Sequence, residues 1–304
     1  MDPEKLAVAR FRGSPRARGL AHGETFAPRI HELLERWGNT LERGYGVQRR
    51  RYVDLFLAET GYERATQEWA PRVLEEVQGI AEGSGADFRT LLAFQHVNEE
   101  FEFAPRFDLA QYLDGFQVLL RVNCDESDGE IIMLSVPGMI SLMGMNCHGL
   151  AVCDNTLTQL RTDANGVPIY ALYRLLLESP SRAAARALIE RTPHAVGLNW
   201  VIGDGGGVMM LERSAAQTVD YGPAESACLA YHTNHPLKCA DWQRDFSGAE
   251  PPQPYRSSYL RFAALHQRLQ GVRAEDISVQ SLKDVLASRD DRDYPVSRGG
   301  GRNG

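Results

Sequence analysis

Four consecutive polar residues late in the chain could carry chemistry. They are His232, Thr233, Asn234 and His235, which end an apolar run and are followed at once by Pro236. Binding and catalytic groups concentrate in loops at the ends of rigid elements, so this strand end could aim its side chains into a site. A strand end whose polar groups only satisfy one another explains the same residues, and the composition leaves the two interpretations about equal.

Two other patterns have simpler explanations than chemistry. Cys147 and His148 are adjacent, and neighbours on a strand point to opposite faces, so the imidazole is badly placed to activate the thiol. We predict that Cys147 and Cys153 are small buried side chains. The residues from Gly203 to Gly207 precede a predicted strand and not a helix, which indicates a hairpin turn and not a phosphate-binding loop.

The composition is typical of a globular protein with a net negative charge. The 304 residues include 33 Lys and Arg against 40 Asp and Glu, a formal charge of −7, and 43% are hydrophobic. Such a chain is a poor partner for nucleic acids or anionic membranes. It shows no membrane-spanning run and no secretory signal. Its five cysteines include no CxxC pair, so we expect a reduced, cytoplasmic protein without metal or cofactor.

The chain is predicted to begin with helices and to continue with strands and helices mixed. Apolar residues recur at helical spacing over 25–43 and 69–80, and Asp87 is a good N-cap for a helix over 88–94. Predicted strands cover 115–122, 131–136, 150–153, 198–202, 208–211 and 228–232, and later helices cover 169–177, 181–190, 257–269 and 281–286. This order predicts an α+β fold. We divide it into a helical region, 1–104, a core, 105–298, and an unstructured tail, 299–304.

Short motifs along most of the chain follow the order of a known family. They are Arg12 to Pro15, His22 to Glu24, Glu75 to Gly83, Asp114 to Arg121, Gly138 to Ile140 with Gly144 to Asn146, Gly149 to Cys153 with Asn155, Asn199 to Asp204, Tyr231 to His235, and Ser257 with Ser258. Together they resemble the peptidase C45 family, the acyl-coenzyme A:6-aminopenicillanic acid acyltransferase-like proteins. The resemblance implies an N-terminal-nucleophile hydrolase fold, an αββα sandwich, preceded here by the helical region.

The resemblance also implies a mechanism. Family members cut themselves before a Cys, whose thiol becomes the nucleophile and whose α-amine is the general base. An α-amine titrates at about pH 8 and can therefore accept the thiol proton. The thiolate attacks an amide or thioester carbonyl, and amide groups stabilise the oxyanion. The implied partner is a small acylated amide or thioester substrate, which includes acyl-CoA. Neither a nucleic acid nor a membrane is expected as a partner.

Three residues receive roles from this resemblance. Asn234 matches the family's catalytic Asn and would donate its amide to the oxyanion. Asn155 lies where related hydrolases place a second polar contact. Asp108 matches the Asp that would orient the ammonium group of the nucleophile or a substrate amine.

The chain departs from the family pattern where the nucleophile should be. Glu100 is followed almost at once by Asp108, so a strand–turn–strand unit of roughly fifteen to twenty-five residues is missing. No Cys occurs before Cys124, and the acidic Asp125 and Glu126 beside it would raise its pKa.

Family members also continue with further strands where this chain ends. We therefore expect a fold that lacks strands at the nucleophile segment and at the C-terminus, and a chain that is inactive as written. Two alternatives remain open. One is a non-catalytic protein that binds small acylated ligands, and the other is a Cys hydrolase built on Cys147 or Cys124.

Overall fold

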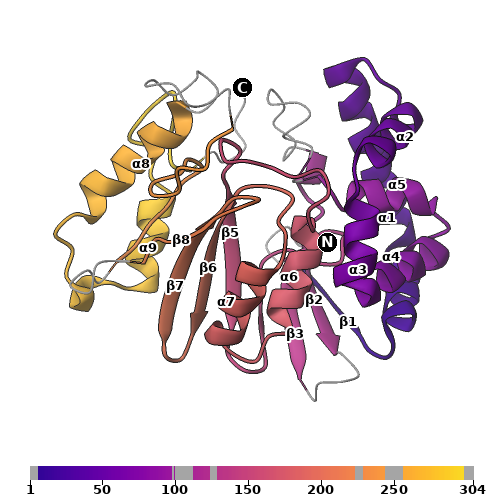
Figure 1. Cartoon of the computed structure of the whole chain (residues 1–304), viewed down its shortest axis with the longest axis horizontal. Helices are drawn as coiled ribbons and strands as arrows, with labels where there is room; N and C mark the ends of the chain where they lie inside the picture. The colour runs from indigo at the N-terminus through magenta and orange to yellow at the C-terminus, as the bar shows by residue number, and fades with distance from the viewer. Residues whose placement is uncertain are drawn as a thin grey trace.

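The structure is a computed structural model that describes residues 6–97, 99, 112–123, 129–222, 229–243 and 256–297 (Figure 1). Its helices are α1 (Pro15–Tyr45), α2 (Arg49–Glu59), α3 (Tyr62–Trp69), α4 (Pro71–Ser84), α5 (Phe88–Phe94), α6 (Ile169–Leu177), α7 (Arg182–Arg191), α8 (Arg256–Leu269) and α9 (Val279–Leu286). Its strands are β1 (Ala7–Phe11), β2 (Val118–Asn123), β3 (Glu130–Ser135), β4 (Gly144–Asn146), β5 (Ala151–Thr156), β6 (Leu198–Asp204), β7 (Gly207–Arg213) and β8 (Thr218–Asp220). No helix among these residues is long and apolar enough to cross a membrane.

The predicted α+β class is confirmed. The helices α1 to α5 precede β2, and α6 and α7 lie between β5 and β6 in the chain. The predicted cap at Asp87 is also confirmed, because its side chain accepts from the N–H of Thr90 at 2.8 Å. Ser181 caps α7 in the same way and accepts from the N–H of Ala184 at 3.3 Å. The glycines after 203 form the predicted hairpin turn, with Asp204 paired to Gly207.

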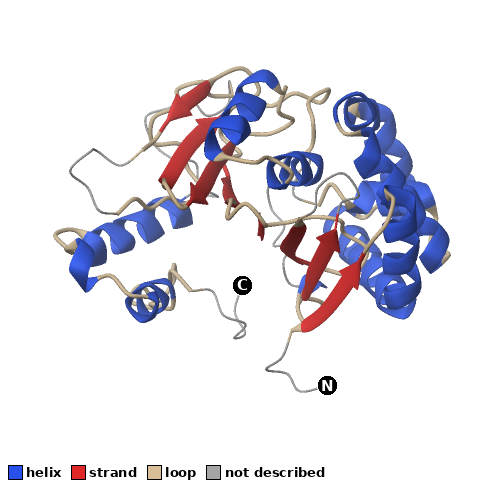
Figure 2. Cartoon of the chain, turned by 90° about the horizontal axis from the view of Figure 1, so that it is seen from below, coloured by secondary structure: helices blue, strands red, loops and turns tan. Residues whose placement is uncertain are grey.

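The described strands form one hydrogen-bonded series in chain order, from β1 to β8. β1 pairs with β2 in parallel, and every later pair is antiparallel. The short β4 links two parts of the series, β1–β3 and β5–β8, which Figure 2 shows on either side of it. The helices α1 to α5 lie beside the β1 end, and α8 and α9 lie towards the β8 end (Figure 1).

Several strands differ from the predictions, among them the short β4 and β8, which were not predicted. The strand β1 was not predicted, because its partner β2 lies more than a hundred residues away and five residues give little periodicity. The predicted strand over 228–232 is wrong for its described part, since 229–232 is not in a strand. Residues 299–304 and most of the boundary at 104/105 lie outside the described residues, so the predicted division of the chain stays a prediction.

The helices α1 and α4 touch through glycines. A Cβ added at Gly19 would lie 2.0 Å from the carbonyl oxygen of Glu76, and one added at Gly79 would lie 2.3 Å from that of Arg16. Gly23 and Gly83 continue the contact one turn further, at 2.4 Å and 2.1 Å from opposing carbonyl oxygens. The two backbones are therefore in direct contact, which only glycine permits.

Strand alternation decides what β5 presents on each face. Asp154 points towards α6, where the hydroxyl of Tyr173 donates to it. Cys153 points the other way and is exposed, as is Cys147. The prediction that both thiols are buried is therefore wrong: the apolar run around Cys153 is buried on one face only, under α6, and the thiol stands on the other.

Candidate functional site

A row of polar side chains crosses the middle of the sheet on the face away from α6. Asn155 on β5 pairs in register with Asn199 on β6, and Asn199 pairs with Glu212 on β7. Cross-strand partners share one face. The Asn199 amide donates to Oδ1 of Asn155 at 3.3 Å. Asn199 and Glu212 are completely buried, whereas Asn155 at the end of the row is half-buried.

The predicted residue Asn234 lies at the same end of β5. Its Nδ2 donates to the carbonyl oxygen of Thr156 at 3.2 Å, directly beside Asn155. Gln159 donates to the backbone carbonyl of Asn234 at 3.3 Å. The structure thus brings two of the three predicted site residues, Asn155 and Asn234, to one strand end, and both are half-buried.

The helix α8 fixes the orientation of the Asn234 amide. Nη2 of Arg261 donates to Oδ1 of Asn234 at 2.9 Å, and Nε of Arg261 donates to Ser257 at 3.3 Å. The backbone N–H of Asn234 donates to the hydroxyl of Ser258 at 2.7 Å. A flipped amide would set its NH₂ group against the guanidinium, donor against donor. Arg261 therefore holds the amide with its NH₂ group on the β5 side.

Glu212 anchors the segment that carries Asn234. Its carboxylate accepts from Nε2 of His232 at 2.8 Å and from three consecutive backbone N–H groups, those of Leu237, Lys238 and Cys239, at 2.7, 2.9 and 2.5 Å. Burial alone would raise the pKa of Glu212, but these hydrogen bonds outweigh burial and lower it. A buried, ionised carboxylate thus holds residues 232–239 against β7.

The neighbours of Asn234 satisfy one another. Thr233 donates to the carbonyl oxygen of Ser258 at 3.0 Å, and Nδ1 of His235 lies 2.8 Å from the Ser258 hydroxyl. His235 stacks on Tyr259, with ring centroids 3.8 Å apart. Burial, with the nearby His232 and Arg261, lowers the pKa of His235 to about 4, so its ring is neutral at pH 7. The flanking residues of this run thus satisfy one another, and the role of Asn234 in a site stays a prediction.

Not every predicted residue can be placed. Asp108 and Cys124 lie outside the described residues. Cys153 stands two residues from Asn155 on the same face of β5, but although its side chain is exposed in part, the partial burial of its thiol and the adjacent Asp154 raise the pKa of the thiol. Burial also raises the pKa of Cys239. In the part of the chain that the structure describes, no group of three or more His, Cys, Asp or Glu could hold a metal ion.

Sequence reasoning missed Arg261, Glu212 and Asn199. Arg261 follows Ser257 by four residues on a predicted helix, a spacing that puts both on one face, and this was a usable signal. Glu212 ends an apolar run and Asn199 opens one, and nothing local distinguishes them from ordinary strand ends. Their importance comes from pairing across three strands.

Comparisons with known proteins agree with these motifs. The family described as acyl-coenzyme A:6-aminopenicillanic acid acyl-transferase matches residues 123–297. No curated protein sequence matches the chain significantly. The solved structure of penicillin V acylase from Agrobacterium tumefaciens is 20% identical over 31% of this chain and 33% of its own, with a TM-score of 0.26. A variant of conjugated bile acid hydrolase from Clostridium perfringens is 15% identical over 53% and 63%, with a TM-score of 0.27. The chain thus spans about a third of the first protein and less than two thirds of the second.

Proposed function

The chain belongs to the acyl-coenzyme A:6-aminopenicillanic acid acyl-transferase family, which it matches over more than half its length, and from this premise we propose that the Asn234 cluster is the oxyanion-stabilising part of an N-terminal-nucleophile acyltransferase or amidohydrolase site. The substrate class is a small N-acyl amide, a peptide or an acyl thioester such as an acyl-CoA. The observation that carries the proposal is the fixed, half-buried amide of Asn234 beside Asn155.

The geometry suits an oxyanion that forms when a carbonyl carbon is attacked. Nδ2 of Asn234 makes a rather long hydrogen bond of 3.2 Å to Thr156, and it can exchange this partner for a substrate oxygen that gains negative charge. Arg261, 2.9 Å from Oδ1, keeps the amide from flipping and adds a positive charge behind it. Donors fixed before the reaction stabilise the transition state without reorganisation.

The nucleophile is the part of the proposal in which this chain differs from its family. No Cys precedes Cys124 in the sequence, and Cys153, although close to Asn155, has a raised pKa and is a poor nucleophile. We therefore propose that the chain as given neither cleaves itself nor turns over an acyl substrate, which makes it a pseudoenzyme of the peptidase C45 type. Its cytoplasmic location stays a prediction.

A second candidate function is binding without turnover. The observation that favours it is that Arg261, Ser258 and Glu212 hold the amide cluster rigidly without any contribution from a thiol. Such preformed donors bind a carbonyl or carboxylate oxygen of an acylated ligand at little cost in ordering.

Mass spectrometry and calorimetry test both functions together. The purified chain is incubated with phenylacetyl-CoA or N-phenylacetylglycine, and we expect a single species of 33.9 kDa without an acyl adduct. Saturable binding of either compound supports a binding function. Asn234→Ala should weaken this binding about tenfold, because it removes one charge-assisted hydrogen bond. The control Asn39→Ala, on the exposed face of α1, should bind as the native chain does. Two fragments or a covalent adduct would refute the lack of activity, and the absence of any binding would remove the ligand-binding function.

A further inference from the structure

Both ring nitrogens of His232 face oxygen atoms that accept hydrogen bonds. Nε2 lies 2.8 Å from Oε1 of Glu212, and Nδ1 lies 2.6 Å from the carbonyl oxygen of Thr233. The side chains of His232 and Glu212 are only 1% and 0% exposed. A neutral imidazole has one N–H group and would set a lone pair against one of these oxygens. Both contacts are therefore satisfied together only when each ring nitrogen carries a hydrogen.

The proton between the two side chains belongs to His232 and not to Glu212. The carboxylate also accepts from the backbone N–H groups of Leu237, Lys238 and Cys239, and such donors favour the ionised form of a carboxyl group. Burial by itself raises the pKa of Glu212, but the hydrogen bonds from His232 and from these N–H groups outweigh burial and lower it. The pair is thus an imidazolium ion and a carboxylate.

The imidazolium also holds the peptide group that precedes Asn234. Nδ1 of His232 donates to the carbonyl oxygen of Thr233, and the N–H of the same peptide group, that of Asn234, donates to the hydroxyl of Ser258 at 2.7 Å. This peptide plane is fixed at both ends, from β7 through the ring and from α8 through Ser258. Because the plane sets the direction in which the Asn234 side chain leaves the backbone, the charge of the ring bears on the position of the amide.

We propose that His232 is a doubly protonated imidazolium ion and a positioning residue for Asn234, whose amide keeps its place only while both ring nitrogens carry hydrogens. Loss of one proton leaves a lone pair against either Glu212 or the Thr233 carbonyl and breaks that contact. Histidine is the residue type whose charge changes most readily between about pH 5 and 8, so the contact responds to pH. The link to ligand binding rests on the proposed function, whereas the charge of the ring does not.

The groups around the ring single out His232 as the one that responds. Among the described residues they are Glu212 on β7, Tyr221 after β8, His235 and Lys238 in the same segment, and Arg261 on α8. Burial raises the pKa of Tyr221, so its phenol stays neutral. Burial, with the charges of His232 and Arg261, lowers the pKa of His235 to about 4, so that ring is neutral as well.

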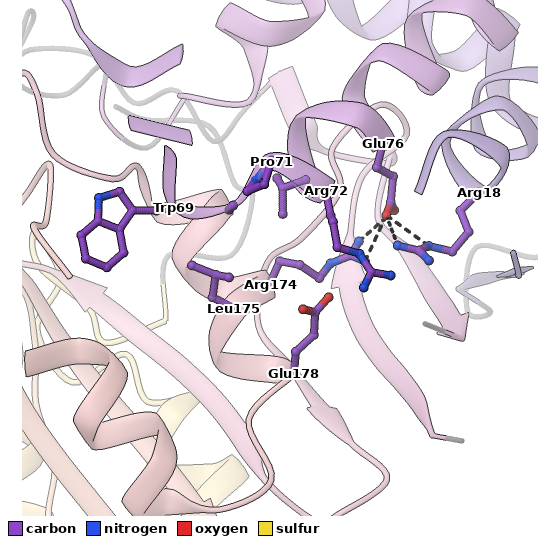
Figure 3. A pocket seen from close by; sticks show the side chains of 10 residues that line it. Arg18, Trp69, Pro71, Arg72, Glu76, Arg174, Leu175 and Glu178 are labelled. Atoms are coloured by element: carbon purple, nitrogen blue, oxygen red, sulfur yellow. Dashed lines mark hydrogen bonds and ion pairs between the residues drawn. The ribbon is translucent and has the colours of Figure 1, made fainter. Parts of the chain in front are cut away.

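A second buried carboxylate in the described part of the chain is held by groups that do not respond to pH. Figure 3 shows Glu76 facing Arg18 and Arg174, whose guanidinium nitrogens lie 2.8 and 2.9 Å from its carboxylate. Burial by itself raises the pKa of Glu76, but the two arginines outweigh burial and lower it. A guanidinium group stays charged at every pH at which a protein is folded. Glu212 has a histidine in this role, which makes its contact reversible.

Nuclear magnetic resonance of the chain with ¹⁵N-labelled histidine measures the charge of the ring directly. The signals of His232 are those that disappear in His232→Gln, and we expect them to show a hydrogen on both ring nitrogens at pH 7. The exposed His148 gives the reference signals in the same spectra. A ring nitrogen of His232 without a hydrogen at pH 7 would overturn the proposal.

Matched variants test the effect on Asn234, and circular dichroism checks that they fold. Binding of N-phenylacetylglycine should weaken about tenfold, the loss of one hydrogen bond, as the pH rises from 6 to 9 in the native chain and in the control His148→Gln. In His232→Gln, which has no ring proton to lose, binding should be weak throughout and independent of pH.

Hydrogen exchange provides a measurement that needs no ligand. The backbone N–H of Asn234 should be less protected in His232→Gln than in His148→Gln at pH 6, and its protection should fall with rising pH only in the control and the native chain. A chain that binds no ligand but shows this exchange pattern refutes the proposed function and supports the positioning role of His232. Equal protection in the two variants would overturn that role.

Discussion

The glycine contact between α1 and α4 makes the fold sensitive to one methyl group. In Gly19→Ala the new Cβ would lie 2.0 Å from the carbonyl oxygen of Glu76, where an ordinary contact needs at least 3.4 Å. The obstacle is backbone, so no side chain can rotate away. The helices must separate by about the difference, 1.4 Å.

This separation has an energetic cost beyond the clash itself. Overpacking a close contact costs about 1–3 kcal/mol. The bond of 2.8 Å between Arg18 and Glu76 spans the same contact and would be lost, and breaking a buried ion pair costs about 3–5 kcal/mol. Alanine in place of glycine returns about 1 kcal/mol of helix propensity. We expect a net loss of about 5 kcal/mol, a large part of the stability of a typical domain.

Urea unfolding followed by circular dichroism measures this loss. Gly38→Ala is the matched control, since Gly38 lies on the same helix and its new Cβ would meet only side-chain carbons of Arg49, the nearest at 3.1 Å. A flexible arginine can move, so the control should stay within about 1 kcal/mol of the native chain. Equal unfolding midpoints for the two variants would refute the reasoning.

Three further predictions concern charged groups. Burial raises the pKa of Glu99 to about 8 from its usual 4.5. Because the unfolded chain loses this proton at a lower pH than the folded chain, the free energy of unfolding should fall by up to about 5 kcal/mol as the pH rises from 4.5 to 8. In urea unfolding across this range Glu99→Gln should show a shallower fall than the native chain, and parallel curves would contradict this prediction. Glu212→Gln should destabilise the fold by about 3 kcal/mol in the same assay, because its amide would turn a donor towards backbone N–H groups. A loss below 1 kcal/mol would be inconsistent with the anchoring of residues 232–239. Arg261→Gln should weaken binding of N-phenylacetylglycine about tenfold by freeing the Asn234 amide to flip, whereas Arg268→Gln on the same helix should leave it unchanged. Equal affinities of the two variants in calorimetry would contradict this prediction.

Local patterns predicted most elements because their causes are local. The helices around Trp37 and Ile80 follow from apolar spacing, and the hairpin after Gly203 from its turn residues. β1 escaped prediction because its stabilising partner is remote in the chain. The predicted strand end at His232 is wrong because the shape of this polar run comes from hydrogen bonds to Glu212, about twenty residues away in the chain.

Some residues of the candidate site could also be predicted from the sequence, and others could not. Asn234 and Asn155 were identified from a family resemblance, and the structure places them together. Arg261 could have been suggested by its helical spacing from Ser257. The anchoring role of Glu212 could not have been predicted, because a carboxylate at a strand end becomes an anchor only when a loop that is distant in the chain folds onto it.

The contacts that hold Asn234 come from elements that are remote in the chain from the segment where the family resemblance would place a nucleophile. Among the described residues, the bonds that orient the amide come from β5, β7, α8 or the segment 231–239. None of these elements borders residues 100–111 in the chain, where the family's nucleophile would lie. The anchoring carboxylate, Glu212, is itself satisfied by backbone N–H groups and His232. Under the proposed function, the Asn234 amide therefore needs no thiol to keep its orientation, because Arg261 on α8 donates to its oxygen.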